Sequence, residues 1–203
     1  MIRRLVLLSF AAASLALPLA ASAADVTEIG SVKYDNTITL GNAKLQLNGA
    51  GIRYKFVKVY TAGLYLTKKA NTPEAVLAAT GPRRMHIVML RDIDANELGK
   101  LLTRGMEQNT SRDEFSKVIP GVIKLGEIFS ARKKLASSDY FSIDYVPGVG
   151  SNIVINGKPA SEPIKEPEFF NALMKIWLGR SPADAQLKDA LLGTTATRDP
   201  FTN

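Results

Sequence analysis

The sequence predicts an α+β domain in which an antiparallel sheet carries a helical layer on one face. Residues 38–47 and 140–157 alternate apolar and polar side chains around tight-turn signals, which is typical of β-hairpins. Two helix starts with capping-box residues lie between these hairpins, and two more helices are predicted near the C-terminus. Strands and helices do not alternate as they do in a parallel α/β sheet, so we expect the helices to pack on one side.

The strand predictions rest on alternation and turn residues. The first hairpin turns at Gly41-Asn42, and the second runs into Asn156-Gly157. Residues 52–66 are rich in Tyr, Phe and Val, contain no proline and alternate imperfectly, which predicts one long, bulged strand with both faces partly covered. Residues 83–91 predict a further strand.

The helix predictions rest on capping residues. Thr72 precedes Pro73, which predicts a short helix with Pro at its first position. The capping-box pattern begins at Asp94 and again at Ser111, and the second of these helices should break or kink at Pro120. Another helix is predicted over 167–178, and the last begins at the Ser-Pro-Ala-Asp run of 181–184.

The N-terminus predicts an exported protein. Arg3 and Arg4 form a short positive region, and an uncharged run rich in Leu and Ala follows up to the Ala-Ser-Ala-Ala of 21–24. We interpret residues 1–23 as a cleaved signal peptide, 24–197 as one domain and 198–203 as a C-terminal tail. The expected location is therefore the periplasm or the medium. A retained membrane anchor is the alternative.

The amino-acid composition excludes several classes of functional site. The 203 residues contain no cysteine, which excludes zinc-thiolate, iron-sulfur and cysteine-nucleophile sites. The net charge of +7 becomes +5 when the signal is removed, and the cations, Arg83 and Arg84 among them, are interleaved with acids as on solvated faces. Export argues against nucleic-acid binding, while a weak attraction to anionic lipid surfaces stays open. No pattern indicates the oligomeric state.

Conventional catalytic motifs do not occur. The chain has no Gly-rich phosphate loop, no Gly-x-Ser-x-Gly elbow and no His-Glu-x-x-His pair, and no metal or cofactor is predicted. The sole histidine, His86, lies on an apolar strand, where a structural role is the more common one. Haem held by His86 or a tyrosine is an alternative. Met85 and Met89 share a face and are predicted to be core.

The densest motif spans residues 49–66 and reads Gly-Ala-Gly-Ile-Arg-Tyr-Lys-Phe-Val-Lys-Val-Tyr-Thr-Ala-Gly-Leu-Tyr-Leu. It resembles the first long strands of the chalcone isomerase family, which carry a similar series of Gly-Ala-Gly, Arg, Lys-Phe-Val-Lys and Gly-x-Tyr-Leu. Met-Glu-Gln-Asn at 106–109 resembles the end of a family helix. Ile-Trp-Leu-Gly at 176–179, followed by Ser-Pro, resembles the family's terminal helices. The resemblance covers 49–192.

The resemblance implies a chalcone-isomerase-like open-faced β-sandwich, with a large antiparallel sheet, a helical layer and a cleft between them. In the plant isomerases a phenolate adds to a conjugated double bond, and arginine, threonine, tyrosine and asparagine side chains hold the nucleophile and the developing enolate. Such a reaction depends on placement and on donors aimed at growing negative charge, without a metal.

The family's site residues carry over in part. Its arginine corresponds to Arg53 and its asparagine to Asn109. Its threonine position falls on Tyr60, and Thr61 would lie on the opposite face of a regular strand. Three further donor positions of the family are apolar in this chain, and they fall on Leu102, Gly105 and Ile176.

This loss of donors favours binding over catalysis. We expect a small lipophilic ligand such as a fatty acid, with Arg53 pairing its carboxylate and Tyr60 donating a hydrogen bond. Leu102, Ile176 and Trp177 would line the tunnel for its tail. The family includes non-catalytic fatty-acid-binding members and haem-binding relatives. Structural roles, on the surface for Arg53 and in the core for Tyr60 and Trp177, stay open.

An enzyme is the first alternative. It would be an intramolecular lyase or isomerase acting on a phenolic enone, with Arg53, Tyr60 or Thr61, and Asn109 as donors. Haem binding is the second alternative, and it would give the purified protein a colour. Fold similarity does not choose among these functions, because function belongs to the site.

Overall fold

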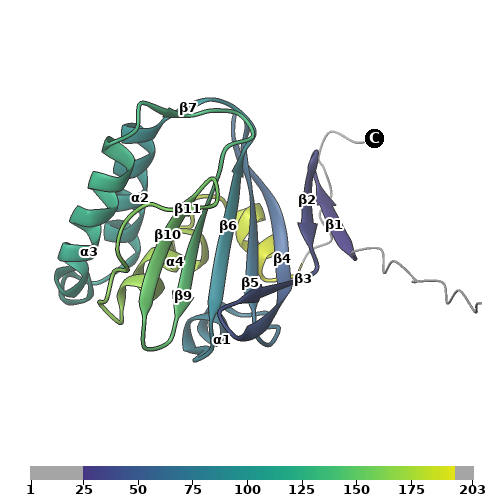
Figure 1. The fold of residues 1–203 in the computed structure, drawn as a ribbon, viewed down its shortest axis with the longest axis horizontal. Coiled ribbons are helices and arrows are strands. Elements are labelled where there is room, and N and C mark those ends of the chain that lie inside the picture. Colours follow the sequence, from purple (N-terminus) through teal and green to yellow (C-terminus); the bar gives the residue numbers. More distant parts are fainter. Residues whose placement is uncertain (1–24, 195–203) are drawn as a thin grey trace, which may run out of the picture.

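A seven-stranded antiparallel sheet forms the centre of the molecule (Figure 1). The computed structural model describes residues 25–194, and the strand order is β11-β10-β9-β6-β5-β4-β3. The strands are β3 (Thr37–Leu40), β4 (Ala43–Lys55), β5 (Val57–Leu66), β6 (Arg83–Met89), β9 (Tyr140–Val146), β10 (Gly150–Ile155) and β11 (Lys158–Pro159). Every neighbouring pair is antiparallel, as predicted.

A helical layer covers one face of this sheet, which confirms the predicted α+β class. The helices are α1 (Pro73–Ala78), α2 (Ala95–Asn109), α3 (Arg112–Ser130), α4 (Phe169–Leu178) and α5 (Ala185–Leu191). Within 25–194, none of them combines the length and apolar content that crossing a bilayer requires. The predicted signal over 1–23, the domain end at 197 and the tail over 198–203 lie outside the described residues.

Both predicted hairpins are present, but the long strand over 52–66 is wrong. β3 pairs with β4, β9 pairs with β10, and the Asn156-Gly157 turn leads from β10 into β11. The run over 52–66 reverses at Phe56, so that Lys55 pairs with Val57 and the run supplies the end of β4 and all of β5. The reversal contains none of the glycine or asparagine residues that usually mark a tight turn.

The helix starts follow the capping residues. Thr72 and Asp94 cap α1 and α2, and Ser111 forms a complete capping box with Glu114. Of the break or kink expected at Pro120, the break does not occur, because α3 continues through this residue, which lies on its exposed side. The last helix begins later than predicted: Asp184 caps α5, accepting a hydrogen bond from the backbone N–H of Leu187 at 3.0 Å.

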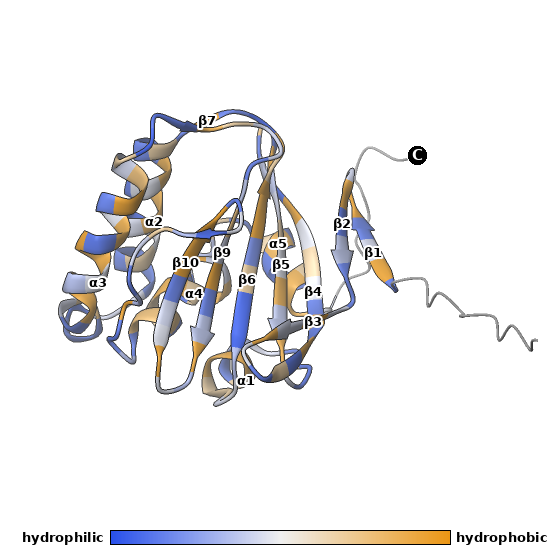
Figure 2. Ribbon diagram, viewed as in Figure 1, coloured by the Kyte–Doolittle hydropathy of each residue, from blue (hydrophilic) through white to orange (hydrophobic). Residues whose placement is uncertain are grey.

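The core lies between the sheet and the helices. Polar and apolar residues share the surfaces of α2 and α3 (Figure 2). Nearly all of α4 is buried. Met85 and Met89 are buried on this side of β6, which confirms that they are core residues. Arg83 is buried with them and contradicts the expectation of a solvated cation. Its guanidinium lies over the rings of Tyr145 and Phe170.

A bulge in β4 decides which way its later residues point. Before the bulge, Leu47 lies opposite Tyr65 on the face away from the helices, whereas after it Gly49 lies opposite Leu64 on the helical face. The extra residue is Asn48, which is buried. Its side chain bonds the backbone N–H and carbonyl of Ala70 and the carbonyl of Leu191. The bulge therefore exchanges the two faces toward which the later side chains of β4 point.

The Gly-Ala-Gly motif lets α5 approach this part of β4. A Cβ atom at Gly49 would overlap the backbone carbonyl of Ala190, and one at Gly51 would lie 2.7 Å from the Ala190 side chain. Glycine therefore allows the helix to lie directly on the strand. Farther along β4, Arg53 lies opposite Tyr60 and shares its face, which is the face toward the helices.

A small hairpin packs against the opposite face of the sheet. β1 (Val26–Ile29) and β2 (Val32–Asp35) pair beside the β3–β4 edge (Figure 1). Tyr34 from this hairpin is buried and donates a 2.7 Å hydrogen bond to the Thr61 hydroxyl. Its ring lies against Gly63, where a Cβ atom would come within 2.6 Å of it. This hairpin partly covers the second face of the sheet, and the sequence patterns did not predict the hairpin itself.

Candidate functional site

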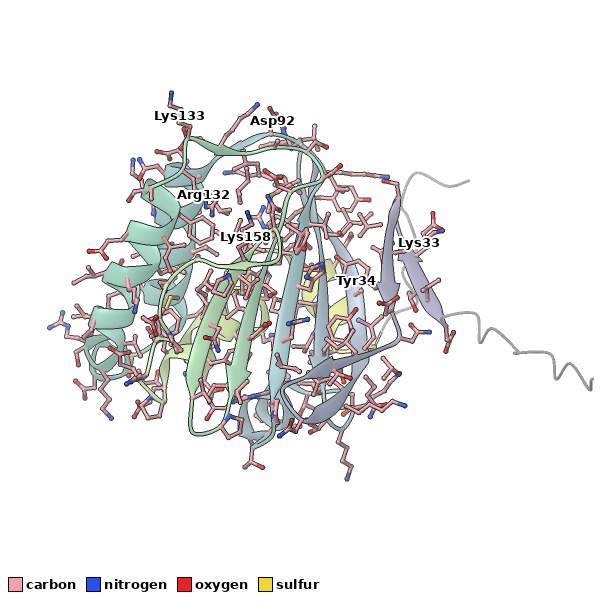
Figure 3. All side chains as sticks on the ribbon, viewed as in Figure 1. Lys33, Tyr34, Asp92, Arg132, Lys133 and Lys158 are labelled. Carbon is pink, nitrogen blue, oxygen red and sulfur yellow. The ribbon has the colours of Figure 1, made fainter. Side chains whose placement is uncertain are left out.

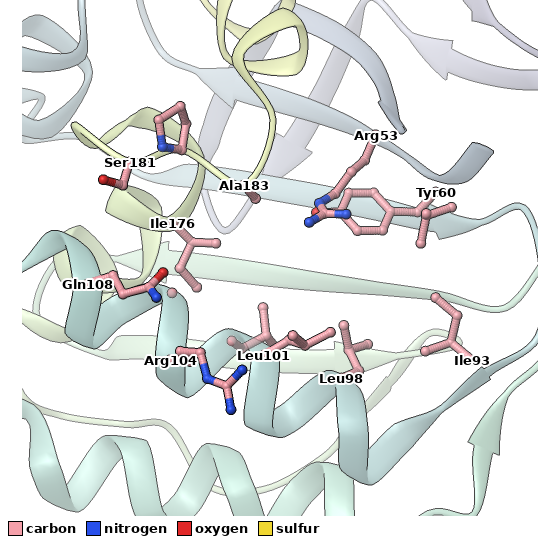
Figure 4. Close-up of a pocket in the computed structure, with 14 residues that line it drawn as sticks. Arg53, Tyr60, Ile93, Leu98, Leu101, Arg104, Gln108, Ile176, Ser181 and Ala183 are labelled. Carbon is pink, nitrogen blue, oxygen red and sulfur yellow. The ribbon is translucent and has the colours of Figure 1, made fainter. Parts of the chain in front are cut away.

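A cleft of about 280 Å³ opens between the sheet and the helical layer (Figure 4). Arg53 and Tyr60 form one side, and residues of α2 form the other. The segment between α4 and α5 closes one end. The lining residues are Arg53, Val59, Tyr60, Ile93, Leu98, Leu101, Leu102, Arg104, Gly105, Gln108, Ile176, Ser181, Pro182 and Ala183.

The cleft has an apolar interior and a polar rim. Tyr60, Leu98, Leu102 and Ile176 are buried, and they line the interior. Arg104, Gln108 and Ser181 are exposed at the rim. A cleft of this kind suits a ligand with an apolar body and a small polar head. Its volume is near the lower end of the range of about 300–1,000 Å³ that is common for ligand pockets.

Tyr60 is held in place by Trp177. The indole Nε1 of Trp177 donates a 2.8 Å hydrogen bond to the Tyr60 hydroxyl, and both side chains are buried. Burial raises the pKa of Tyr60 to about 12, so its hydroxyl keeps its proton at neutral pH. No residue from 25 to 194 accepts that proton in a hydrogen bond. Because Tyr60 lines the cleft, its O–H is a candidate donor for a ligand bound there.

Arg53 lies beside this hydroxyl. Its Cζ atom is 5.8 Å from the centroid of the Tyr60 ring, and Figure 4 shows the guanidinium extended along that ring. No described Asp or Glu forms an ion pair with Arg53. A guanidinium offers a fork of N–H donors that matches a carboxylate. Arg53 and Tyr60 together present donors for an anionic head group.

The other residues predicted for the site divide into two groups. Leu102 and Ile176 line the cleft, and Gly105 lets the two helices meet there, since a Cβ atom on it would lie 3.1 Å from Ile176. Trp177 does not line the cleft, because its side chain lies in the core behind Tyr60.

Asn109 has a structural role next to the cleft. Its Nδ2 donates to the carbonyls of Gly105 and Ser181, each at 2.9 Å, and its Oδ1 accepts from the Ser181 backbone N–H at 2.8 Å. Both ends of the amide are therefore occupied. Asn109 fixes the rim residue Ser181 to the end of α2 and does not line the cleft itself.

Thr61 and His86 lie on the opposite face of the sheet. The Thr61 hydroxyl accepts the hydrogen bond from Tyr34, and the His86 ring lies 5.9 Å from that of Tyr34 and 5.2 Å from that of Tyr140. Burial, with a smaller contribution from Arg84, lowers the pKa of His86 to about 4. His86 is thus a neutral, packed side chain, and neither residue faces the cleft.

Four of the α2 residues that line the cleft were not predicted from the sequence, and they are Leu98, Leu101, Arg104 and Gln108. Leu98, Leu101, Gly105 and Gln108 follow one another at intervals of three or four residues, so the spacing places them on one face of the helix. That spacing could have predicted that these residues share one helix face. It could not have predicted that this face lines a cleft. In the part of the chain that the structure describes, no three His, Asp or Glu side chains gather as metal ligands.

Comparisons with known proteins agree with this architecture. A fatty-acid binding protein of Arabidopsis thaliana superposes with a TM-score of 0.60 at 14% sequence identity, over 80% of this chain and 92% of that one. That similarity concerns the fold. A search of curated protein sequences gives no match. The family model for chalcone isomerase-like proteins matches residues 26–193, nearly the whole described chain. This protein therefore belongs to the chalcone isomerase-like family.

Proposed function

We propose that this protein is an exported binder of a small lipophilic carboxylate, such as a fatty acid, and that it is not an enzyme. The observation that carries the proposal is the pairing of Arg53 and Tyr60 at one side of an apolar cleft. The guanidinium would pair with the carboxylate, and the Tyr60 hydroxyl would donate a second hydrogen bond. The ligand's chain would lie on Leu98, Leu102 and Ile176.

The scarcity of donors supports binding over isomerisation. An enolate-forming reaction needs several donors directed at the growing charge. Thr61 faces away from the cleft, and the Asn109 amide is already bonded at both ends. Arg53 and Tyr60 would remain, which is sufficient to hold a carboxylate. The known ligand class of the Arabidopsis protein of similar fold adds to this argument. The His86 ring packs between two tyrosine rings, and this position gives no support for haem binding through His86.

Export forms the second part of the proposal. It rests on the positive N-terminus, the uncharged run that follows and the Ala-Ser-Ala-Ala before Asp25. The absence of cysteine is compatible with an oxidising compartment. Expression of the full chain in a bacterial host, followed by fractionation and N-terminal sequencing, tests it. A periplasmic product that starts at Ala24 or Asp25 is expected, and a cytoplasmic product that retains Met1 would contradict export.

Ligand binding is tested by native mass spectrometry with extraction of bound small molecules. The chain from Ala24 is compared with Arg53→Ala and with Arg112→Ala, a matched control that removes an exposed cation from the start of α3. A lipophilic carboxylate should co-purify with the unchanged protein and with Arg112→Ala, and should be lost from Arg53→Ala. Loss from both variants, or an empty cleft after incubation with fatty acids, would refute the proposal.

A further inference from the structure

We propose that the tip of the β4–β5 hairpin docks this protein on an anionic lipid bilayer. Phe56 is fully exposed at the tip, with 103% of its reference accessible surface, and Val57 beside it is 46% exposed. Phe56 also has a φ of 64°, a conformation that favours glycine and costs energy for an aromatic residue. An aromatic residue at this position contributes nothing to the core. It is suited to insertion at the interface of a membrane.

Exposed cations lie at the same end of the molecule as this tip, and Lys134 there forms an ion pair with Asp92. Lys55 precedes Phe56 on the hairpin, and Arg91 follows the end of β6, where the Leu90 N–H donates to the Val59 carbonyl at 3.0 Å. β7 (Ile93–Asp94) pairs with β8 (Lys134–Leu135), which brings Lys133 to the same end. Figure 3 shows Lys133 pointing outward from that end. Cations beside an exposed aromatic side chain match the negative surface of an anionic bilayer.

The tip stands next to the candidate cleft. Phe56 lies three residues from Arg53 and three from Val59, both of which line the cleft, a separation of about 10 Å along each strand. Leu101 lines the cleft from α2 and is 45% exposed. Docking through the tip would therefore bring the cleft close to the lipid surface. Exchange of a ligand there rests on the proposed function, but docking itself does not.

The chain offers a matched control at its opposite end. Val149 lies in the turn between β9 and β10 and is 47% exposed, close to the value for Val57. Tyr140, at the start of β9, pairs with Val88 near the end of β6, so the strand runs away from the tip toward the turn that contains Val149. Val57→Ser and Val149→Ser thus remove the same group, equally exposed, from opposite ends of the sheet.

Co-sedimentation with lipid vesicles tests the proposal. The chain from Ala24 retains every described element and lacks the predicted signal, which would bind lipid by itself. Partition is measured with pure phosphatidylcholine vesicles and with vesicles that contain phosphatidylglycerol. We expect binding to the anionic vesicles that salt weakens. Phe56→Ser should weaken binding about tenfold and Val57→Ser roughly fivefold, while Val149→Ser should have no effect.

Each other outcome would overturn the docking proposal. Absence of binding, equal binding to both vesicle types, or equal losses for Val57→Ser and Val149→Ser would each refute it. Retained binding in Phe56→Ser would also refute it and would indicate a protein partner for the tip. Fatty-acid binding is measured in parallel without vesicles. If fatty-acid binding persists while vesicle binding fails, docking is refuted and the proposed function stands. If vesicle binding persists while fatty-acid binding fails, the proposed function is refuted and docking stands.

Discussion

Trp177 donates its indole N–H to the Tyr60 hydroxyl at 2.8 Å, and this hydrogen bond links the core of α4 to the wall of the cleft. The geometry explains how a tyrosine on a sheet strand can serve as a fixed donor. Because its oxygen accepts from Trp177, the Tyr60 proton is directed away from the indole. The indole in turn is held by α4, which is buried along most of its length.

Breaking this pair should destabilise the protein. Tyr60→Phe leaves the buried Trp177 N–H without an acceptor, which should lower the free energy of unfolding by about 1–3 kcal/mol. Trp177→Phe should also destabilise the fold, and the double variant should lose less than the sum of the two. Chemical denaturation of all four proteins gives the coupling free energy. Strict additivity would mean that the hydrogen bond contributes nothing.

Much of the fold could be predicted from local signals, and the site only in part. The turn dipeptides Gly41-Asn42 and Asn156-Gly157 and the capping residues act within a few positions, so they can be recognised in the sequence. The reversal at Phe56 has no such turn dipeptide. The structure therefore has two strands where the sequence predicted one.

The direction in which Arg53 points depends on tertiary contacts. It follows from the bulge at Asn48, whose side chain is held by Ala70 and Leu191, the latter 143 positions away. Nothing in the residues next to Asn48 indicates that bulge. Alternation alone did place Thr61 on the face opposite Tyr60, because the two are neighbours on a regular part of β5.

Gly63 and Gly126 should respond in opposite ways to alanine. In Gly63→Ala the new Cβ atom would lie 2.6 Å from the Tyr34 ring, so the β1–β2 hairpin must shift, and we expect a loss of about 1–3 kcal/mol in unfolding free energy. Gly126 lies inside α3 with nothing within 4 Å of the added atom. Gly126→Ala should therefore stabilise the protein by up to about 1 kcal/mol. Thermal unfolding of both variants checks the two signs.

His86 should make the protein less stable as the pH falls. Burial lowers its pKa to about 4 in the folded state, from an ordinary value of 6.5. Between these values the unfolded chain binds a proton that the folded chain does not, so the free energy of unfolding falls with decreasing pH. The loss should reach about 3 kcal/mol and level off below the folded pKa.

The variant His86→Phe provides the control for this pH effect. It keeps an aromatic ring between Tyr34 and Tyr140 but does not titrate. Its unfolding free energy, measured by urea denaturation from about pH 7 to about pH 4.5, should lack the histidine contribution to the slope. Identical slopes for the two proteins would show that His86 titrates normally.

Arg83 should tolerate little change although it is distant from the cleft. Its Nη1 donates to the Val76 carbonyl at 3.1 Å and to Asn171 Oδ1 at 2.9 Å, and its guanidinium carbon lies 4.7 Å from the Phe170 ring centroid. Lysine has no planar group to stack there, so Arg83→Lys should cost about 2 kcal/mol or more. Arg112→Lys, on an exposed site, should change stability by less than about 0.5 kcal/mol. Equal effects in denaturation experiments would refute the structural role of Arg83.

The pairing of Arg53 with a carboxylate is tested most directly by comparing a fatty acid with its methyl ester. The sole tryptophan, Trp177, lies directly behind Tyr60, so its fluorescence can follow each titration. The unchanged protein should prefer the acid by at least about tenfold, because a hydrogen-bonded ion pair contributes about 1.5–3 kcal/mol. Arg53→Gln should bind acid and ester almost equally. An undiminished preference for the acid in Arg53→Gln would contradict the account.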